Sequence, residues 1–135
     1  MSRALVIDDD PAFRLALADV LRVEGYTTLS AATCHEALGA LASECVDVLF
    51  LDVNLPDGSG LDLLPGPGAP TVIVTGEPSL SLADEALRLG ARDCLAKPVD
   101  RMRVRMTLAG LARERGLREE IDRLRAEVVA LRSRL

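Results

Sequence analysis

Residues 4–11 (Ala-Leu-Val-Ile-Asp-Asp-Asp-Pro) decide the fold of this chain, because four apolar residues run directly into three carboxylates and a proline. A short apolar run that contains β-branched residues is typical of a strand buried on both faces of a parallel sheet. Pro11 suits the first turn of a helix, and Asp10 suits the N-cap position before it. The stretch therefore predicts a buried strand, a short acidic turn and then a helix.

The rest of the chain repeats this alternation. Further strands are predicted at residues 27–30, 47–52, 71–75 and 92–96, and helices at 79–89 and from 101 onward. Another helix is predicted after Thr33, a candidate N-cap with Glu36 three residues later. The prolines and glycines at 65–68 restrict a third helix to residues 60–64, because proline disrupts helix interiors. Strands that alternate with helices predict an α/β fold, a doubly wound five-stranded parallel sheet with an extended C-terminal helix.

Composition narrows the possible functions. At 135 residues and 49% apolar content the chain can bury a full core, and its 2% of aromatic residues offers no platform for stacking nucleic-acid bases. The net charge is −5, but residues 1–100 hold six Lys or Arg against sixteen Asp or Glu, which argues against direct nucleic acid binding by this part. Residues 101–135 hold ten Arg against five acids, so DNA contact by this basic tail is the alternative. No signal peptide or membrane-length apolar stretch occurs, so a cytoplasmic protein that does not enter a membrane is expected. The three cysteines are expected to be buried free thiols.

The C-terminal segment has a heptad pattern. Leu117, Ile121, Leu124, Val128, Leu131 and Leu135 recur at alternating spacings of four and three. Leucine at d with Ile or Val at a favours a parallel two-stranded coiled coil. Glu120 and Glu127 fall at g, and Arg125 and Arg132 fall at e, so the pattern predicts Glu–Arg pairs in a homodimer. The alternative is a surface helix that folds its leucine stripe back onto the domain.

The residues with chemical function stand at strand ends. Asp8, Asp9 and Asp52 end the first and third predicted strands, and Thr75 and Lys97 end the fourth and fifth. Parallel strands gather their carboxyl ends at one edge, where ligands bind. Two carboxylates about 4 Å apart repel by roughly 4 kcal/mol at an effective dielectric near 20, so raised pKa values or a bound cation must offset the repulsion. Hard oxygen ligands suit Mg²⁺. The pocket therefore fits phosphoryl transfer to a carboxylate.

These stretches resemble a known family. Residues 6–11, 51–58, 74–76 and 95–98 are similar, in order, to the four signature stretches of bacterial two-component response-regulator receiver domains. The greatest similarity is to receivers followed by a helical linker in enhancer-binding (AAA+) transcription activators. The resemblance implies the flavodoxin-like receiver fold, with a receiver domain at residues 1–115 and a coiled-coil extension at 116–135.

The resemblance also implies residue roles. Asp52 would accept a phosphoryl group from a sensor histidine kinase, and Thr75 and Lys97 would contact the phosphoryl oxygens. Asp8, Asp9, Asp52 and the backbone carbonyl of Asn54 would hold Mg²⁺. The chain would be a signalling domain and not an enzyme, and phosphorylation would change its conformation or dimerisation to control a transcriptional output. A cis peptide bond between Lys97 and Pro98 is also implied.

Three departures from the family pattern leave alternatives open. The third helix is shortened, Cys94 replaces the usual Tyr or Phe three residues before Lys97, and no output domain is recognisable. A receiver-like dimerisation module that no longer uses phosphate is therefore a second hypothesis. An aspartate-nucleophile phosphatase of the haloacid dehalogenase type is a third, although such enzymes carry a second acid two residues after the nucleophile, where this chain has Asn54.

Overall fold

The computed structural model describes residues 2–66 and 68–135. Their elements, in chain order, are β1 (Ser2–Ile7), α1 (Pro11–Val23), β2 (Tyr26–Ala31), α2 (Cys34–Ser43), β3 (Val48–Asp52), β4 (Asn54–Leu55), β5 (Gly58–Ser59), η1 (Gly60–Leu63), β6 (Thr71–Thr75), α3 (Leu80–Arg88), β7 (Asp93–Ala96) and α4 (Arg101–Ser133). Residues 1–101 form one compact unit and residues 102–135 form a second.

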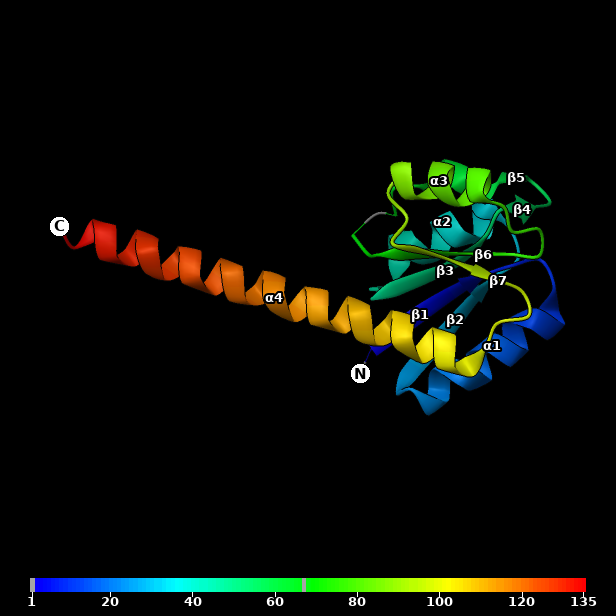
Figure 1. Cartoon of the computed structure of the whole chain (residues 1–135), viewed down its shortest axis with the longest axis horizontal. Helices are drawn as coiled ribbons and strands as arrows, with labels where there is room; N and C mark the ends of the chain where they lie inside the picture. Colours follow the sequence, from blue (N-terminus) through cyan, green and yellow to red (C-terminus); the bar gives the residue numbers. More distant parts are fainter. Residues whose placement is uncertain (1, 67) are drawn as a thin grey trace. The chain divides into compact units, whose positions relative to one another are not determined.

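The central sheet has five parallel strands in the order β2-β1-β3-β6-β7 (Figure 1). The predicted doubly wound parallel sheet is therefore confirmed, and its strand order is the flavodoxin-like one. The order reverses between β1 and β3, where Ile7 pairs with Leu51. Side chains that follow these two strands consequently meet at the switch point of the sheet, which is where open α/β sheets bind ligands.

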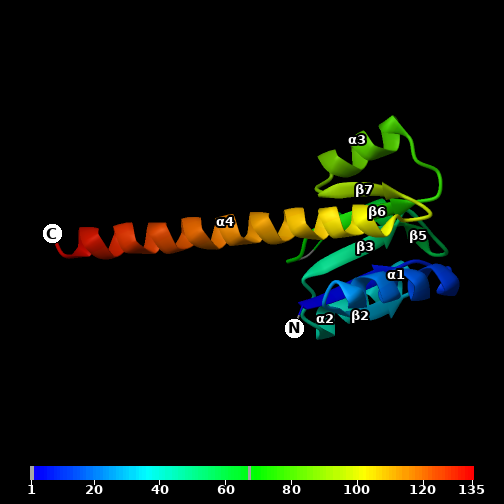
Figure 2. The same cartoon turned by 60° about the horizontal axis from the view of Figure 1, so that its bottom comes forward.

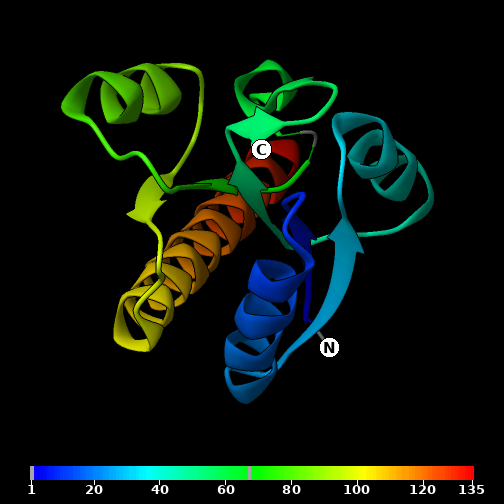
Figure 3. The ribbon, with the colours of Figure 1, turned by 90° about the vertical axis from the view of Figure 1, so that its right-hand side faces the viewer.

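Helices cover both faces of this sheet, as shown by α1 (blue) below the strands and α2 (cyan), η1 and α3 (green) above them in Figure 3. Toward α2 and α3 the strands present a buried cluster that includes Leu5, Leu49, Leu51 and Ile73. Because β1, β3 and β6 are apolar toward both faces, they are buried almost completely. The strand ends are therefore held rigidly.

Local sequence explains where the helices begin. Asp10 accepts a hydrogen bond from the amide of Ala12 at 3.0 Å, and Thr33 accepts one from the amide of Glu36 at 3.0 Å, so both predicted N-caps are confirmed. The third helix is cut down as predicted, to the single 3₁₀ turn η1. A short antiparallel hairpin, β4–β5, precedes it and was not predicted.

The cysteines only partly follow the prediction. All three are free thiols, but Cys45 is exposed and Cys34 and Cys94 are half-buried. The prediction of buried thiols is therefore wrong. Cys45 lies in the loop between α2 and β3, and Cys34 is the first residue of α2, where its side chain packs against the core cluster but stays only partly buried.

The second unit consists of α4, one uninterrupted helix that continues to Ser133 (Figure 2). Its 33 residues correspond to a length of about 50 Å at the usual rise per residue. The heptad side chains, from Leu117 to Leu131, are largely exposed. No helix among the described residues combines the length and apolar character needed to span a membrane. The domain boundary at residue 115 stays a prediction.

Gly60 allows the chain to pass directly over Asp52. Its amide donates to the carbonyl of Val53 at 2.7 Å. A Cβ atom at Gly60 would lie 2.1 Å from the backbone oxygen of Asp52 and 3.1 Å from the side chain of Leu51. The backbone of Asp52 is buried and cannot move away without disturbing β3, so only glycine fits at position 60.

We expect Gly60→Ala to lower the free energy of unfolding by about 1–3 kcal/mol, the usual cost of overpacking. Gly39→Ala is the matched control, because a Cβ there meets nothing within 4 Å and alanine favours a helix by up to about 1 kcal/mol. Urea unfolding of both variants and the parent measures the difference. Equal stability of Gly60→Ala and the parent would contradict the close approach.

Candidate phosphoacceptor site

Two buried carboxylates form the centre of the site. Asp8 directly follows β1, and Asp52 is the last residue of β3. Only 1% of Asp8 and 7% of Asp52 is exposed. Since β1 and β3 are neighbours in the sheet, their ends place the two side chains at one edge, as the sequence predicted.

Lys97 joins these carboxylates. Its Nζ donates to Oδ2 of Asp8 at 2.5 Å and to Oδ2 of Asp52 at 3.4 Å. The lysine follows β7, two strands away from β3, and its peptide bond to Pro98 is cis, as the resemblance implied. A single ammonium thus shares its charge between two buried anions.

The charges around Asp52 compete. Burial and the negative charge of Asp8 raise the pKa of Asp52, while the charge of Lys97 and the amide of Asn54 lower it in part. Burial alone would lower the pKa of Lys97, but its hydrogen bond to Asp8 and the charges of Asp52 and Asp8 raise it. The lysine therefore stays charged, and any further positive charge in the pocket would favour an ionised Asp52.

Asp9 completes a cluster suited to a cation. One carboxylate oxygen each from Asp8, Asp9 and Asp52 lies within 4.8 Å of the others, with Asp9 facing solvent. Hard oxygen ligands with open positions fit Mg²⁺, which keeps several waters and binds phosphate oxygens. The donor set therefore fits the expected metal. For Asn54, the structure shows its amide donating to Oδ1 of Asp52 at 3.4 Å.

Thr75 lies at the same edge. It is the last residue of β6, which lies between β3 and β7, and 1% of it is exposed. Its Oγ1 accepts a hydrogen bond from the amide of Glu77 at 3.1 Å, and its carbonyl accepts one from the amide of Lys97 at 2.8 Å. The structure thus places Thr75 on the strand between those that carry Asp52 and Lys97.

The first turn of α1 supports the site with two residues that the sequence did not indicate. Arg14 donates from Nη1 to the backbone carbonyl of Asp8 at 2.5 Å. The ring centroid of Phe13 lies 4.4 Å from Nζ of Lys97. Phe13 stands at helical spacing from Leu17 and Leu21, which is typical of an apolar helix face and gives no signal for a contact with a charge.

Asp57 is another residue that the sequence did not indicate, because an aspartate between proline and glycine is typical of an ordinary turn. From the β4–β5 turn its carboxylate accepts hydrogen bonds from the amides of Cys34 at 2.8 Å and His35 at 3.0 Å. These are the first amides of α2, which have no partner within the helix. The hairpin that follows Asp52 is therefore tied to the N-terminus of α2.

Cys94 occupies β7 three residues before Lys97. Burial, together with the negative charge of Asp93, raises the pKa of its thiol. The thiol is therefore protonated at neutral pH and has weak nucleophilic character. His35, at the start of α2, is exposed.

Comparison with known proteins decides the family. A sequence model of the response regulator receiver domain matches residues 4–109. The chain belongs to the response-regulator receiver family. The resemblance inferred from the sequence motifs is thereby confirmed, and the relatives include the response regulator protein PilR and the transcriptional regulatory proteins AlgB and DctD.

The response regulator protein PilR of Pseudomonas aeruginosa is 41% identical over 118 residues, which are 84% of this chain and 26% of PilR. A response regulator structure from Burkholderia pseudomallei, with a phosphorylated aspartic acid, a calcium ion and citrate, is 31% identical with a TM-score of 0.75, covering 90% of this chain and 75% of that one. The beryllofluoride-activated NtrC4 receiver domain dimer is 31% identical with a TM-score of 0.78, covering 84% and 98%. The chain spans half or less of the length of the curated relatives it matches.

The Asp57 tether predicts a pH-dependent stability. The amides of Cys34 and His35 hold the pKa of Asp57 below its ordinary value of 3.8. A carboxyl group with a lowered pKa in the folded state stabilises that state above the ordinary pKa, and the effect is lost as the pH falls through the lowered pKa. We therefore expect Asp57→Asn to reduce the free energy of unfolding at neutral pH and the difference to vanish in strong acid.

Urea unfolding across this pH range measures the effect. Asp62→Asn is the control, because it removes an exposed carboxylate from the neighbouring turn η1 and leaves the tether intact. Equal stability of Asp57→Asn and the parent at neutral pH would show that the tether contributes nothing.

Proposed function

We propose that this receiver is a phosphoacceptor switch in which Asp52 takes a phosphoryl group from a sensor histidine kinase in the cytoplasm. The observation that carries the proposal is the position of the Asp52 carboxylate, which is buried at the switch point of the sheet and 3.4 Å from the ammonium of Lys97. In the transfer, the bond between phosphorus and the kinase histidine breaks, and a bond between phosphorus and a carboxylate oxygen of Asp52 forms. The ionised carboxylate is the nucleophile.

The surrounding residues supply positive charge and hydrogen bonds. Lys97 neutralises charge that develops on the phosphoryl oxygens, and the Thr75 hydroxyl donates a hydrogen bond to one of them. Asp8, Asp9, Asp52 and the Asn54 carbonyl would hold Mg²⁺, which supplies charge neutralisation for the transferring group when bound. A cation beside Asp8 also weakens the repulsion that raises the pKa of Asp52.

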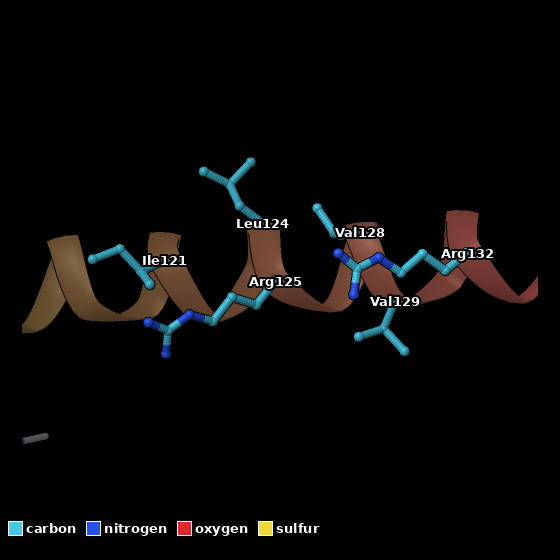
Figure 4. Close-up of a pocket in the computed structure, with 6 residues that line it drawn as sticks. All are labelled: Ile121, Leu124, Arg125, Val128, Val129 and Arg132. Carbon is cyan, nitrogen blue, oxygen red and sulfur yellow. The ribbon is translucent and has the colours of Figure 1, made fainter.

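Features of the C-terminal helix support the proposal that this chain forms a homodimer. Ile121, Leu124 and Val128 line an apolar surface on α4, bordered by Arg125 and Arg132 (Figure 4). A dimer seam requires such an apolar stripe with charged margins. The parallel arrangement would pair these arginines with Glu120 and Glu127 of the other copy, whereas an antiparallel arrangement would place like charges together.

Within one chain the two g-position glutamates already have a partner. Arg123 donates to Glu127 at 2.8 Å and to Glu120, and it therefore bridges both along the helix surface. Exposed pairs of this kind contribute little, typically below about 1 kcal/mol. The interchain pairs consequently face only weak competition, and phosphorylation would act on the geometry of a modest dimer to control a transcriptional output.

The first test is uptake of a phosphoryl group. We expect the protein, incubated with Mg²⁺ and acetyl phosphate, to gain one phosphoryl group by intact mass, and Asp52→Asn to gain none. An absence of uptake by the parent, with Mg²⁺ binding shown by calorimetry, would favour the phosphate-independent dimerisation module. Steady release of phosphate from an external ester would instead favour the phosphatase hypothesis.

The dimer is tested by charge reversal in the full chain. We expect Glu120→Arg/Glu127→Arg and Arg125→Glu/Arg132→Glu each to dimerise at least about threefold more weakly than the parent, because each places like charges opposite one another. A mixture of the two variants should restore the affinity, as measured by sedimentation. Glu119→Arg makes the same charge change at the outward f position and should have no effect. Unchanged dimerisation of both double variants would argue against this seam.

A further inference from the structure

The ammonium of Lys97 has a third partner besides the two carboxylates. Its Nζ lies 4.4 Å from the ring centroid of Phe13, within the usual range of a cation–π interaction. Only 21% of the Lys97 side chain is exposed. The ring and the carboxylates of Asp8 and Asp52 together account for much of what shields this charge from water.

The start of α1 fixes where the ring lies. Asp10 caps the helix and Pro11 is its first residue, so Phe13 falls in the first turn beside the end of β1. Leu17, one turn later on the same face, is completely buried, whereas Phe13 is half-exposed. Phe13 thus stands where the apolar face of α1 ends and the acidic pocket begins.

The ring matters because the shorter of the two Lys97 hydrogen bonds is made to Asp8, which is also a proposed metal ligand. Asp8 accepts from Nζ at 2.5 Å, while Asp52 accepts at 3.4 Å. A cation bound by the Asp8 carboxylate would share its negative charge, and Asp8 would then hold the ammonium less firmly. Lysine is a point charge on a flexible stem, so it then needs another restraint. An aromatic face attracts a cation and does not compete for a metal.

We propose that Phe13 is a positioning residue that holds the Lys97 ammonium beside Asp52 through its ring face. This inference rests on the proposed phosphoacceptor function and deepens it. The ring keeps the lysine within reach of the phosphoryl oxygens while Asp8 is engaged elsewhere. Phe13 acts only through Lys97 and touches no reacting atom.

The test compares two substitutions. Phe13→Leu keeps apolar volume but removes the ring face, and Phe13→Tyr keeps the face. The proposal predicts that Phe13→Leu takes up phosphate from acetyl phosphate about two- to fivefold more slowly, while Phe13→Tyr stays close to the parent. Leu15→Ala, an exposed apolar residue on the same helix, should leave the rate unchanged.

A second measurement follows the lysine directly. Ring currents should shift the Lys97 side-chain proton signals upfield in the parent and in Phe13→Tyr, with and without Mg²⁺, and the shift should be lost in Phe13→Leu. Loss of the shift together with slower uptake supports the proposal. A rate equal to the parent in Phe13→Leu, an equally slow Phe13→Tyr, or a parent without the shift would each overturn it.

The two proposals fail in different ways. If the parent takes up no phosphoryl group, the proposed function fails, while the Lys97 signals still decide whether the ring holds the ammonium. If the parent is phosphorylated normally and Phe13→Leu is too, only the role of Phe13 is lost. Thermal unfolding of each variant separates slow chemistry from poor folding.

Discussion

The structure of this site depends on one constraint, which is that two carboxylates are buried side by side at the end of a parallel sheet. Asp8 and Asp52 are almost inaccessible, and the ammonium of Lys97 forms ion pairs with both. Buried like charges are tolerated only with nearby compensation. The pocket therefore favours binding of an additional cation, and Lys97 could also bind an anionic oxygen there. Arg14 and Phe13 also contact this cluster and add no negative charge to it. Arg14 donates to the backbone carbonyl of Asp8, and the ring of Phe13 faces the ammonium of Lys97.

The loop after Asp52 extends this constraint to the backbone. Gly60 passes within contact of the Asp52 carbonyl, and Asp57 fastens the same loop to the start of α2. These two contacts restrain the loop, although the third helix next to it is reduced to one 3₁₀ turn. The β4–β5 hairpin and the hydrogen bonds of Asp57 thus hold the loop after Asp52 where η1 is only one turn long.

The sheet and the acidic pocket could be predicted because short stretches of sequence, each read by itself, indicate the strands and the residues at their ends. Each buried strand is an apolar run, and a residue at a strand end, such as Asp52 or Lys97, must lie at the common edge of a parallel sheet. Contacts set by loop path and side-chain direction could not be predicted in this way. Asp57 looks like an ordinary turn residue, and Phe13 has the spacing of a core residue. Sequence pattern also does not distinguish a buried thiol from the exposed Cys45, because cysteine is compatible with both.

On the phosphoacceptor proposal, the small side chain of Cys94 limits how a phosphorylation signal can leave the pocket. Its side chain packs partly buried against the core of the sheet and offers no large ring that could swing. Thr75 offers another route, because its hydroxyl already accepts the amide of Glu77. A hydroxyl can accept one hydrogen bond and donate another at once, so Thr75 can turn toward a phosphoryl oxygen without releasing that amide. On the phosphoacceptor proposal, the movement then passes along the backbone through Glu77 to Ser79, the residue that caps α3.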